Sequence, residues 1–316
     1  MKQLLLTCLL AMQVSFAYAE DPWALLEGAA EAARELSYRG IFVYQSGNNS
    51  RSVEITHMNY GQGEYARSVV LDGSPREVLS QGSDVVIYSP RNEKVVITKR
   101  RAQNLFPALL PPEVDVLKAS YEARLGGQER VGGREGQVIF LDSRDQYRYG
   151  YKFWTDREYG LILKSMTFNE NNEPIEQITF TQLTLMDTQN MDWFQPHVDP
   201  AKHYVMEEEN VAVSQADISG MRMGQLPAGF KKIDQVRRMV TGKQTPVTHL
   251  IYSDGLACVS LFIEPVSKKR QPKLGGHMLG STHFYTHVSD GYQVVAVGEV
   301  PAATVAHMAN AVKFKK

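Results

Sequence analysis

The chain contains the residue types that do chemistry in proteins, but their spacing matches no common catalytic motif. It has no G-x-S-x-G nucleophile elbow, no phosphate-binding loop, no dinucleotide fingerprint, no C-x-x-C pair and no H-E-x-x-H pattern. Its carboxylates are scattered and lie mostly in expected turns, so nothing supports a paired acid and base. We therefore expect a protein that is not an enzyme and that needs no cofactor.

Two histidines come closest to the spacing of metal ligands. His283 and His287 are four residues apart, which would place both rings on one face of a helix. The residues around them, 282–287, are instead typical of a β-strand, in which positions i and i+4 lie about 13 Å apart. We therefore expect no metal site at this pair.

One cysteine, Cys258, lies beyond the first 19 residues, so it has no partner for an internal disulfide. Its neighbours, residues 256–261, are typical of a strand. A reactive thiol needs exposure and a basic neighbour. We expect a buried, unreactive thiol instead.

A proline-broken apolar run at residues 105–112 is the most unusual feature of the sequence. Its large apolar side chains belong to Leu105, Phe106, Leu109 and Leu110. They could form a fixed plug packed inside a curved sheet, or a movable lid over an apolar cavity. Because buried Leu and Phe are the commoner case, the residues alone favour a plug. A plug that can be displaced would satisfy both interpretations.

Charge is unevenly divided along the chain, although the net charge is only −1. Residues 20–220 contain 20 Lys and Arg against 30 Asp and Glu, whereas residues 221–316 contain 13 against 5. This asymmetry indicates either two units that attract each other or two units with different partners. The candidate docking residues for an acidic partner are Lys231, Lys232, Arg237, Arg238, Lys268, Lys269, Arg270 and Lys273. Loop solubility is the simpler interpretation of these residues.

The first 19 residues are typical of an export signal. Lys2 is followed by an apolar stretch from Leu4 to Ala11 and by the cleavage pattern Ala17-Tyr18-Ala19. We expect cleavage after residue 19 and a soluble periplasmic protein, because no later run approaches the roughly 18 apolar residues of a membrane span. Export also makes nucleic acid a poor candidate partner.

Hydrophobic periodicity indicates two domains within the 316 residues. Asp21-Pro22 opens a helix, and short strands with tight turns then form an antiparallel, curved or barrel-like meander. Helical spacing at residues 113–125 interrupts this meander. We place the first domain at 20–198, a linker at 199–224, and a smaller α+β domain at 225–316, in which strands precede a helix that starts at Pro301.

Seven short segments occur in a fixed order along the chain: RDQYRYG (144–150), LKS (163–165), FTQL (180–183), LPAGF (226–230), YSDGLA (252–257), SLFIEP (260–265) and VGEVP (297–301). Through these segments the chain resembles the RseB/MucB family over nearly its whole mature length. Ala228 stands where a second proline is usual, and Cys258 is also unusual at its position. Each segment is short, but the ordered set is specific.

The resemblance implies a fold and a function. The first domain should be an unclosed, antiparallel barrel like those of LolA and LolB, with helices and an apolar cavity. The second should bind the periplasmic domain of an RseA/MucA-like anti-sigma factor, shield it from regulated proteolysis and so restrain the sigma-E envelope-stress response. Lipid, lipopolysaccharide acyl chains or mislocalised lipoprotein should release this restraint.

Two other classes of protein compete with a regulator. A periplasmic carrier of lipid or lipoprotein would use the first domain alone, and co-purification of acyl chains without an anti-sigma factor would favour it. A periplasmic hydrolase would need a catalytic triad, for which the sequence offers no candidate. The sequence leaves the oligomeric state open, including a homo-oligomer.

Overall fold

A computed structural model describes residues 20–61, 63–91, 93–99, 105–187, 190–195, 201, 203–208, 220–238, 246–266 and 272–314. The expected export signal therefore lies outside the described residues, as do Lys268, Lys269 and Arg270.

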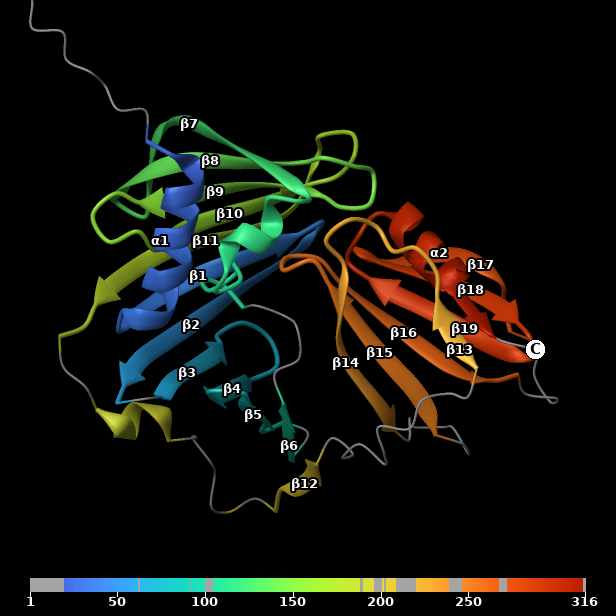
Figure 1. Cartoon of the computed structure of the whole chain (residues 1–316). Coiled ribbons are helices and arrows are strands. Elements are labelled where there is room, and N and C mark those ends of the chain that lie inside the picture. The colour runs from blue at the N-terminus through green and yellow to red at the C-terminus, as the bar shows by residue number, and fades with distance from the viewer. Residues whose placement is uncertain are drawn as a thin grey trace, which may run out of the picture.

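Twelve strands of the described chain form one large curved sheet (Figure 1). They are β1 (Tyr38–Ser46), β2 (Asn49–Tyr60), β3 (Gly63–Val70), β4 (Arg76–Gln81), β5 (Asp84–Ser89), β6 (Lys94–Lys99), β7 (Tyr121–Val131), β8 (Arg134–Ser143), β9 (Gly150–Asp156), β10 (Ile162–Phe168), β11 (Pro174–Leu185) and β12 (Val205–Glu208). Their order is β12-β6-β5-β4-β3-β2-β1-β11-β10-β9-β8-β7, and only the β12–β6 pair is parallel. The two end strands do not pair with each other, so the predicted unclosed, mainly antiparallel sheet is confirmed.

Helix α1 (Pro22–Glu35) packs on the inner face of this sheet. Asp21 caps the helix by accepting a hydrogen bond of 3.0 Å from the backbone N–H of Trp23, and Pro22 occupies the first helical position. Leu26 and four alanines are buried, and small side chains allow the helix to lie close to the strands. The predicted opening helix is confirmed.

The prediction of a helix at residues 113–125 was wrong. A short 3-10 helix, η1 (Val114–Leu117), is followed after three residues by strand β7. Tyr121 and Leu125 fit the helical spacing that we assigned to them, but they also fit the period of two of a strand, and both pack against the core. Gly126 and Gly127 then disfavour a helix, so pairing with β8 decides the outcome.

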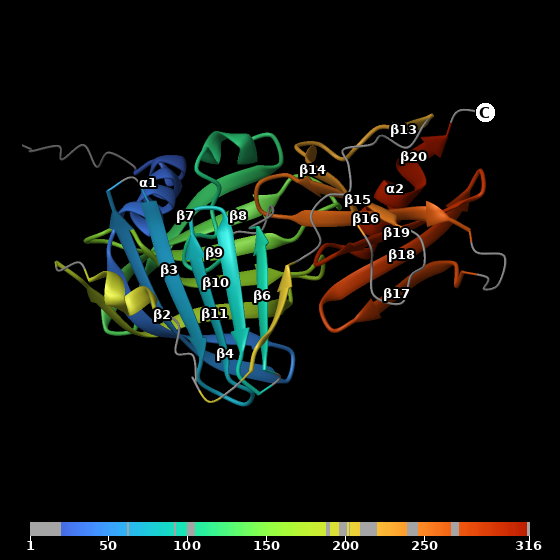
Figure 2. The same ribbon diagram turned by 90° about the horizontal axis from the view of Figure 1, so that it is seen from below.

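A second, smaller sheet lies beside the first (Figure 2). Its strands are β14 (Lys231–Arg238), β15 (Val247–Ser253), β16 (Cys258–Pro265), β17 (Gly275–Leu279), β18 (Thr282–Ser289) and β19 (Tyr292–Gly298), in the order β14-β15-β16-β19-β18-β17. Helix α2 (Ala302–Ala311) packs against β16, β18 and β19. Val305 and Met308 on α2 join Leu261 and Val294 in a separate hydrophobic core. The predicted small sheet-and-helix domain is confirmed.

Parts of the expected linker belong to these domains. Within residues 199–224, Val205–Glu208 forms β12 at one end of the large sheet. Met221–Met223 forms β13, which pairs with β20 (Val312–Phe314) of the second domain. Residues 209–219 lie outside the described part of the chain.

Across the described residues, neither α1 nor α2 has the length and apolar character that a membrane-spanning helix requires.

Candidate functional site: the apolar segment and the domain junction

The apolar run enters the core of the first domain with two of its four large side chains. Phe106 is 4% exposed and Leu110 is fully buried. The ring of Phe106 lies 5.1 Å from that of Phe42 and 4.9 Å from that of Phe180, so it joins an aromatic cluster on the sheet. Leu109 is partly buried against this core, whereas Leu105 is 53% exposed.

Arg34, in the last turn of α1, holds this apolar segment in place. Its Nη2 donates a hydrogen bond of 2.6 Å to the carbonyl of Leu110, and its Nη1 donates one of 2.5 Å to the carbonyl of Ala30. A guanidinium bond to a carbonyl is charge-assisted and stronger than a neutral bond. The segment is therefore fixed to the helix as well as to the sheet.

The same segment continues to the second domain. The turn after β15 has Gly255 at φ +106°, a conformation that favours glycine. A Cβ at Gly255 would lie 3.0 Å from Leu117, 3.2 Å from Val116 and 3.3 Å from Pro111. The turn thus rests directly on Pro111, near the end of the apolar run, and on Val116 and Leu117 of η1.

A buried ion pair joins the two domains at this point. The Nη1 of Arg148, from the β8–β9 connection, donates a hydrogen bond of 2.6 Å to Oδ2 of Asp254, and neither side chain is exposed. The Nη2 of Arg148 also donates to the carbonyl of Ala228 at 2.7 Å. Asp145 accepts two further bonds from Arg148, each of 3.0 Å. We call this group of four residues the junction cluster.

The turn around Asp254 is built to hold its charge. Its Oδ1 accepts backbone N–H bonds from Leu256 at 3.0 Å and from Ala257 at 2.8 Å. Burial raises the pKa of Asp254, while Arg148 and these two N–H groups oppose the rise. Burial also opposes the charge of Arg148, but Asp145 and Asp254 outweigh it and raise the pKa of the guanidinium. Removal of either partner would leave a buried charge poorly compensated.

Two contacts from α2 extend the junction. Thr304 donates a hydrogen bond of 2.7 Å to the carbonyl of Tyr147, and the Tyr147 hydroxyl lies 3.4 Å from Nδ1 of His307. Ser120, which follows η1, donates to the carbonyl of Ala228 at 3.2 Å. Strand ends and loops of both domains therefore meet around the junction cluster.

Sequence reasoning did not single out Arg148 or Asp254 as functional residues. A signal was present, because three segments that carry the family resemblance, 144–150, 226–230 and 252–257, meet at the junction cluster. These three motifs share no chemical role, and their packing against one another explains why they occur together.

The predicted basic docking residues are not brought together on one edge of the second sheet. Lys231, Lys232 and Arg237 are exposed on β14, and Arg238 ends this strand. Lys273 is exposed two residues before the start of β17. Strands β14 and β17 form opposite edges of the sheet (Figures 1 and 2).

The other candidate residues lie in strands, as their patterns predicted. His283 and His287 are both on β18, and Nδ1 of His283 lies 2.8 Å from the carbonyl of Val300. The described residues contain no group of three or more side chains that could hold a metal ion. Cys258 begins β16 and is half-buried, not fully buried as expected. The burial that it has raises the pKa of its thiol to about 11, which disfavours the reactive thiolate.

Both domains match models of known protein domains. The model of the MucB/RseB N-terminal domain matches residues 21–198, and that of the MucB/RseB C-terminal domain matches residues 215–313. The chain belongs to the MucB/RseB family. It is 33% identical to the sigma factor AlgU regulatory protein MucB of Pseudomonas aeruginosa over 98% of this chain and 96% of that protein. It is 25% identical to the sigma-E factor regulatory protein RseB of Escherichia coli over 92% of this chain and 90% of that protein.

Solved structures of this family share the fold. The complex of Pseudomonas aeruginosa MucA and MucB matches with a TM-score of 0.74 and 29% identity, covering 94% of this chain and 100% of that one. A crystal structure of MucB matches with a TM-score of 0.67 and 28% identity, covering 94% and 99%. The relatives are named as regulatory proteins, in agreement with the absence of a catalytic motif from the sequence.

Proposed function

We propose that this chain is a periplasmic regulator that binds the periplasmic region of a membrane anti-sigma factor. By binding, it shields that factor from regulated proteolysis and restrains the sigma-E response. The observation that carries the proposal is the whole-length similarity to MucB solved in complex with MucA(peri), with a TM-score of 0.73 and 30% identity over 94% of this chain.

Lipid acyl chains are the proposed releasing signal, and the apolar segment is their proposed competitor. Phe106 and Leu110 bury apolar surface worth about 1.5–3 kcal/mol each, and a lipid gains about 0.8 kcal/mol per buried CH₂. An acyl chain of ordinary length therefore has enough apolar surface to replace both side chains. A ligand shifts a conformational equilibrium only by its differential affinity, so lipid must bind the displaced form better.

The junction offers a route from the first domain to the second. Displacement of residues 105–110 would also move residues 111–117, on which the turn at Gly255 rests. That turn holds Asp254 against Arg148. The lipid-bound form would then present a different arrangement of the two domains, with lower affinity for the anti-sigma factor.

A lipid or lipoprotein carrier is the alternative, because it too would use the apolar interior of the first domain. A carrier gives no reason for a second domain tied to the first by a fully buried ion pair. This contact favours a regulator, in which the second domain responds to the state of the first.

Binding and protection tests distinguish these functions. The mature protein is titrated with the purified periplasmic region of the same organism's anti-sigma factor, and cleavage of that region by its protease is followed with and without the protein. We expect binding, protection, and release of both by a fluorescent long-chain fatty acid. Fatty-acid binding without any affinity for the anti-sigma region would refute the regulator and support the carrier.

A further inference from the structure

The two edges of the second sheet differ in how they are protected. Edge strands normally carry charges, prolines or bulges that prevent another strand from pairing with them. Strand β14 has these features: Lys231, Lys232 and Arg237 are exposed, and a bulge lies between Lys232 and Asp234. It is poorly suited to accept a further strand.

Strand β17, at the other edge, has no such protection. It pairs with β18 in a regular register and has no other strand neighbour among the described residues. The strand contains no lysine, arginine or proline. Met278 and Leu279 are 63% and 75% exposed, and Leu274, just before the strand, is 62% exposed. An unpaired edge with exposed apolar side chains can accept an extended peptide.

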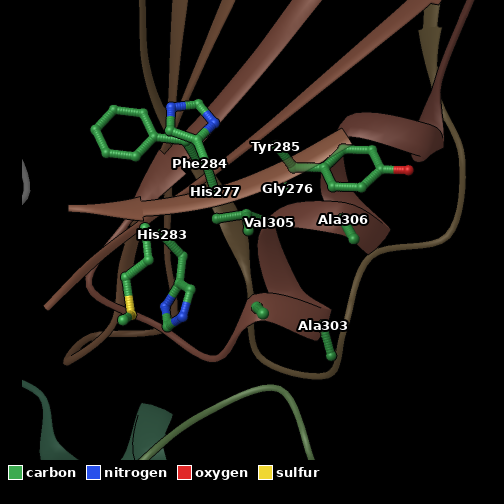
Figure 3. Close-up of a pocket in the computed structure, with 10 residues that line it drawn as sticks. Gly276, His277, His283, Phe284, Tyr285, Ala303, Val305 and Ala306 are labelled. Atoms are coloured by element: carbon green, nitrogen blue, oxygen red, sulfur yellow. The ribbon is translucent and has the colours of Figure 1, made fainter. Parts of the chain in front are cut away.

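A pocket of about 600 Å³ lies between this edge strand and α2 (Figure 3). Its strand side is formed by Gly276, His277 and Met278 of β17 and by His283, Phe284 and Tyr285 of β18. Its helix side is formed by Ala302, Ala303, Val305 and Ala306. The small helix residues and the missing side chain at Gly276 leave room for one apolar side chain from outside.

The net charge of the domain and the hydrogen-bonding groups of the edge strand indicate what kind of molecule binds at this edge. Residues 221–316 contain 13 Lys and Arg against 5 Asp and Glu, and four of the basic residues lie within 268–273, just before β17. Two copies of the chain that paired through β17 would bring together two domains of the same positive net charge. An acyl chain would leave the N–H and C=O groups of the edge without partners, whereas a peptide strand satisfies them.

We propose that β17 and the adjoining pocket form the docking site for an acidic, extended segment of the anti-sigma factor's periplasmic region. The segment pairs with the free edge of β17, inserts one apolar side chain into the pocket and places acidic residues near Lys273. This inference rests on the proposed function and specifies where the partner binds.

Two substitutions in the full mature protein test this site. Gly276→Leu places a bulky side chain in the pocket lining, and the backbone accepts a Cβ there because the nearest atoms lie 3.7 Å away. Met278→Lys places a charge on the exposed edge. Ile233→Lys is the matched control, since Ile233 is 53% exposed on the opposite edge strand. The probe is the purified periplasmic region of the anti-sigma factor.

We expect each β17 variant to bind the probe at least about tenfold more weakly than the unchanged protein, while the control binds within about twofold. Hydrogen exchange of the unchanged protein provides a second measurement that needs no variant. Binding of the probe should slow exchange of the β17 amides and leave the β14 amides unaffected.

These experiments distinguish failure of the docking site from failure of the proposed function. If the unchanged protein does not bind the probe, the proposed function fails. If it binds, but both β17 variants bind equally well and the β17 amides stay unprotected, the docking site is wrong while the function stands. The site is also wrong if Met278→Lys only abolishes self-association, or if Gly276→Leu abolishes only fatty-acid binding.

Discussion

Asp254→Asn is the substitution that most directly tests whether the junction couples the two domains. The asparagine keeps an oxygen that can accept the N–H bonds of Leu256 and Ala257, and it nearly preserves the shape of the side chain. It removes the negative charge that faces Arg148 at 2.6 Å. The substitution therefore isolates the ion pair from the turn that supports it.

The structure sets the expected magnitude. Breaking a buried ion pair by removing one partner costs about 3–5 kcal/mol, because the other charge stays buried. Asp145 still holds two bonds to Arg148 and is 27% exposed, so we expect the lower end of this range, about 3 kcal/mol. Asp254→Ala should cost about 1 kcal/mol more for each of the two lost backbone bonds.

Calorimetry and chemical denaturation measure this effect. If the junction couples the domains, the unchanged protein unfolds in one transition and Asp254→Asn separates it into two. Asp156→Asn is the matched control, because Asp156 is also buried, pairs with Arg134 and caps a turn, but lies wholly within the first domain. It should destabilise that domain without separating the transitions.

A small destabilisation, or one that is not specific to the junction, would contradict this prediction. If Asp254→Asn changes the free energy of unfolding by less than about 1 kcal/mol, the buried pair contributes little. If both substitutions separate the transitions equally, the effect is general destabilisation. In the variant, fatty acid should also release the anti-sigma region less effectively, and unchanged release would exclude the junction from the signalling route.

Three further predictions concern other parts of the chain. Replacing Leu109 and Leu110 with serine should strengthen binding of a fluorescent fatty acid if the segment is a displaceable competitor; a folded variant with unchanged affinity and unchanged partner release would remove the segment from the mechanism. Burial raises the pKa of Glu176 above its ordinary 4.5, so its contribution to stability is full below about pH 4.5 and is lost as the pH rises through its folded-state pKa. Glu176→Gln should therefore flatten this decrease in urea-unfolding experiments between pH 4 and 7, and an unchanged pH profile would contradict the raised pKa. Periplasmic material should have the intact mass of a chain that begins at Glu20, and a mass that includes residues 1–19 would count against export.

Local patterns were sufficient to predict most of the strands and turns. The hairpin between β18 and β19 is an example, because Asp290 and Gly291 both adopt positive φ angles, 49° and 81°, as the Asp-Gly pair predicts. Strand β17 was missed, since Gly275 and Gly276 weaken the strand pattern and its exposed side chains do not alternate. Its identity as a strand depends on pairing with β18.

The candidate site was less predictable than the fold. Composition identified the apolar run, and Phe106 and Leu110 do enter the core, but their displacement by lipid stays a prediction. Arg148 and Asp254 are 106 residues apart in sequence, and each alone is typical of a solvated turn. Only the packing of one domain on the other makes them a buried pair.

The pairing of β1 with β11 also has a consequence for the synthesis of the protein. This pairing joins Tyr38 to Leu185, and it alone connects the meander β1–β6 to the meander β7–β11 within the described sheet. A Cβ at Gly40 would lie 2.5 Å from the carbonyl oxygen of Gln182, so the contact closes only with glycine at this position. A chain that emerges from its N-terminus must wait for β11 before the sheet can be completed, and contacts so distant in sequence form slowly. Until then both edges of the first meander are open to pairing with wrong partners.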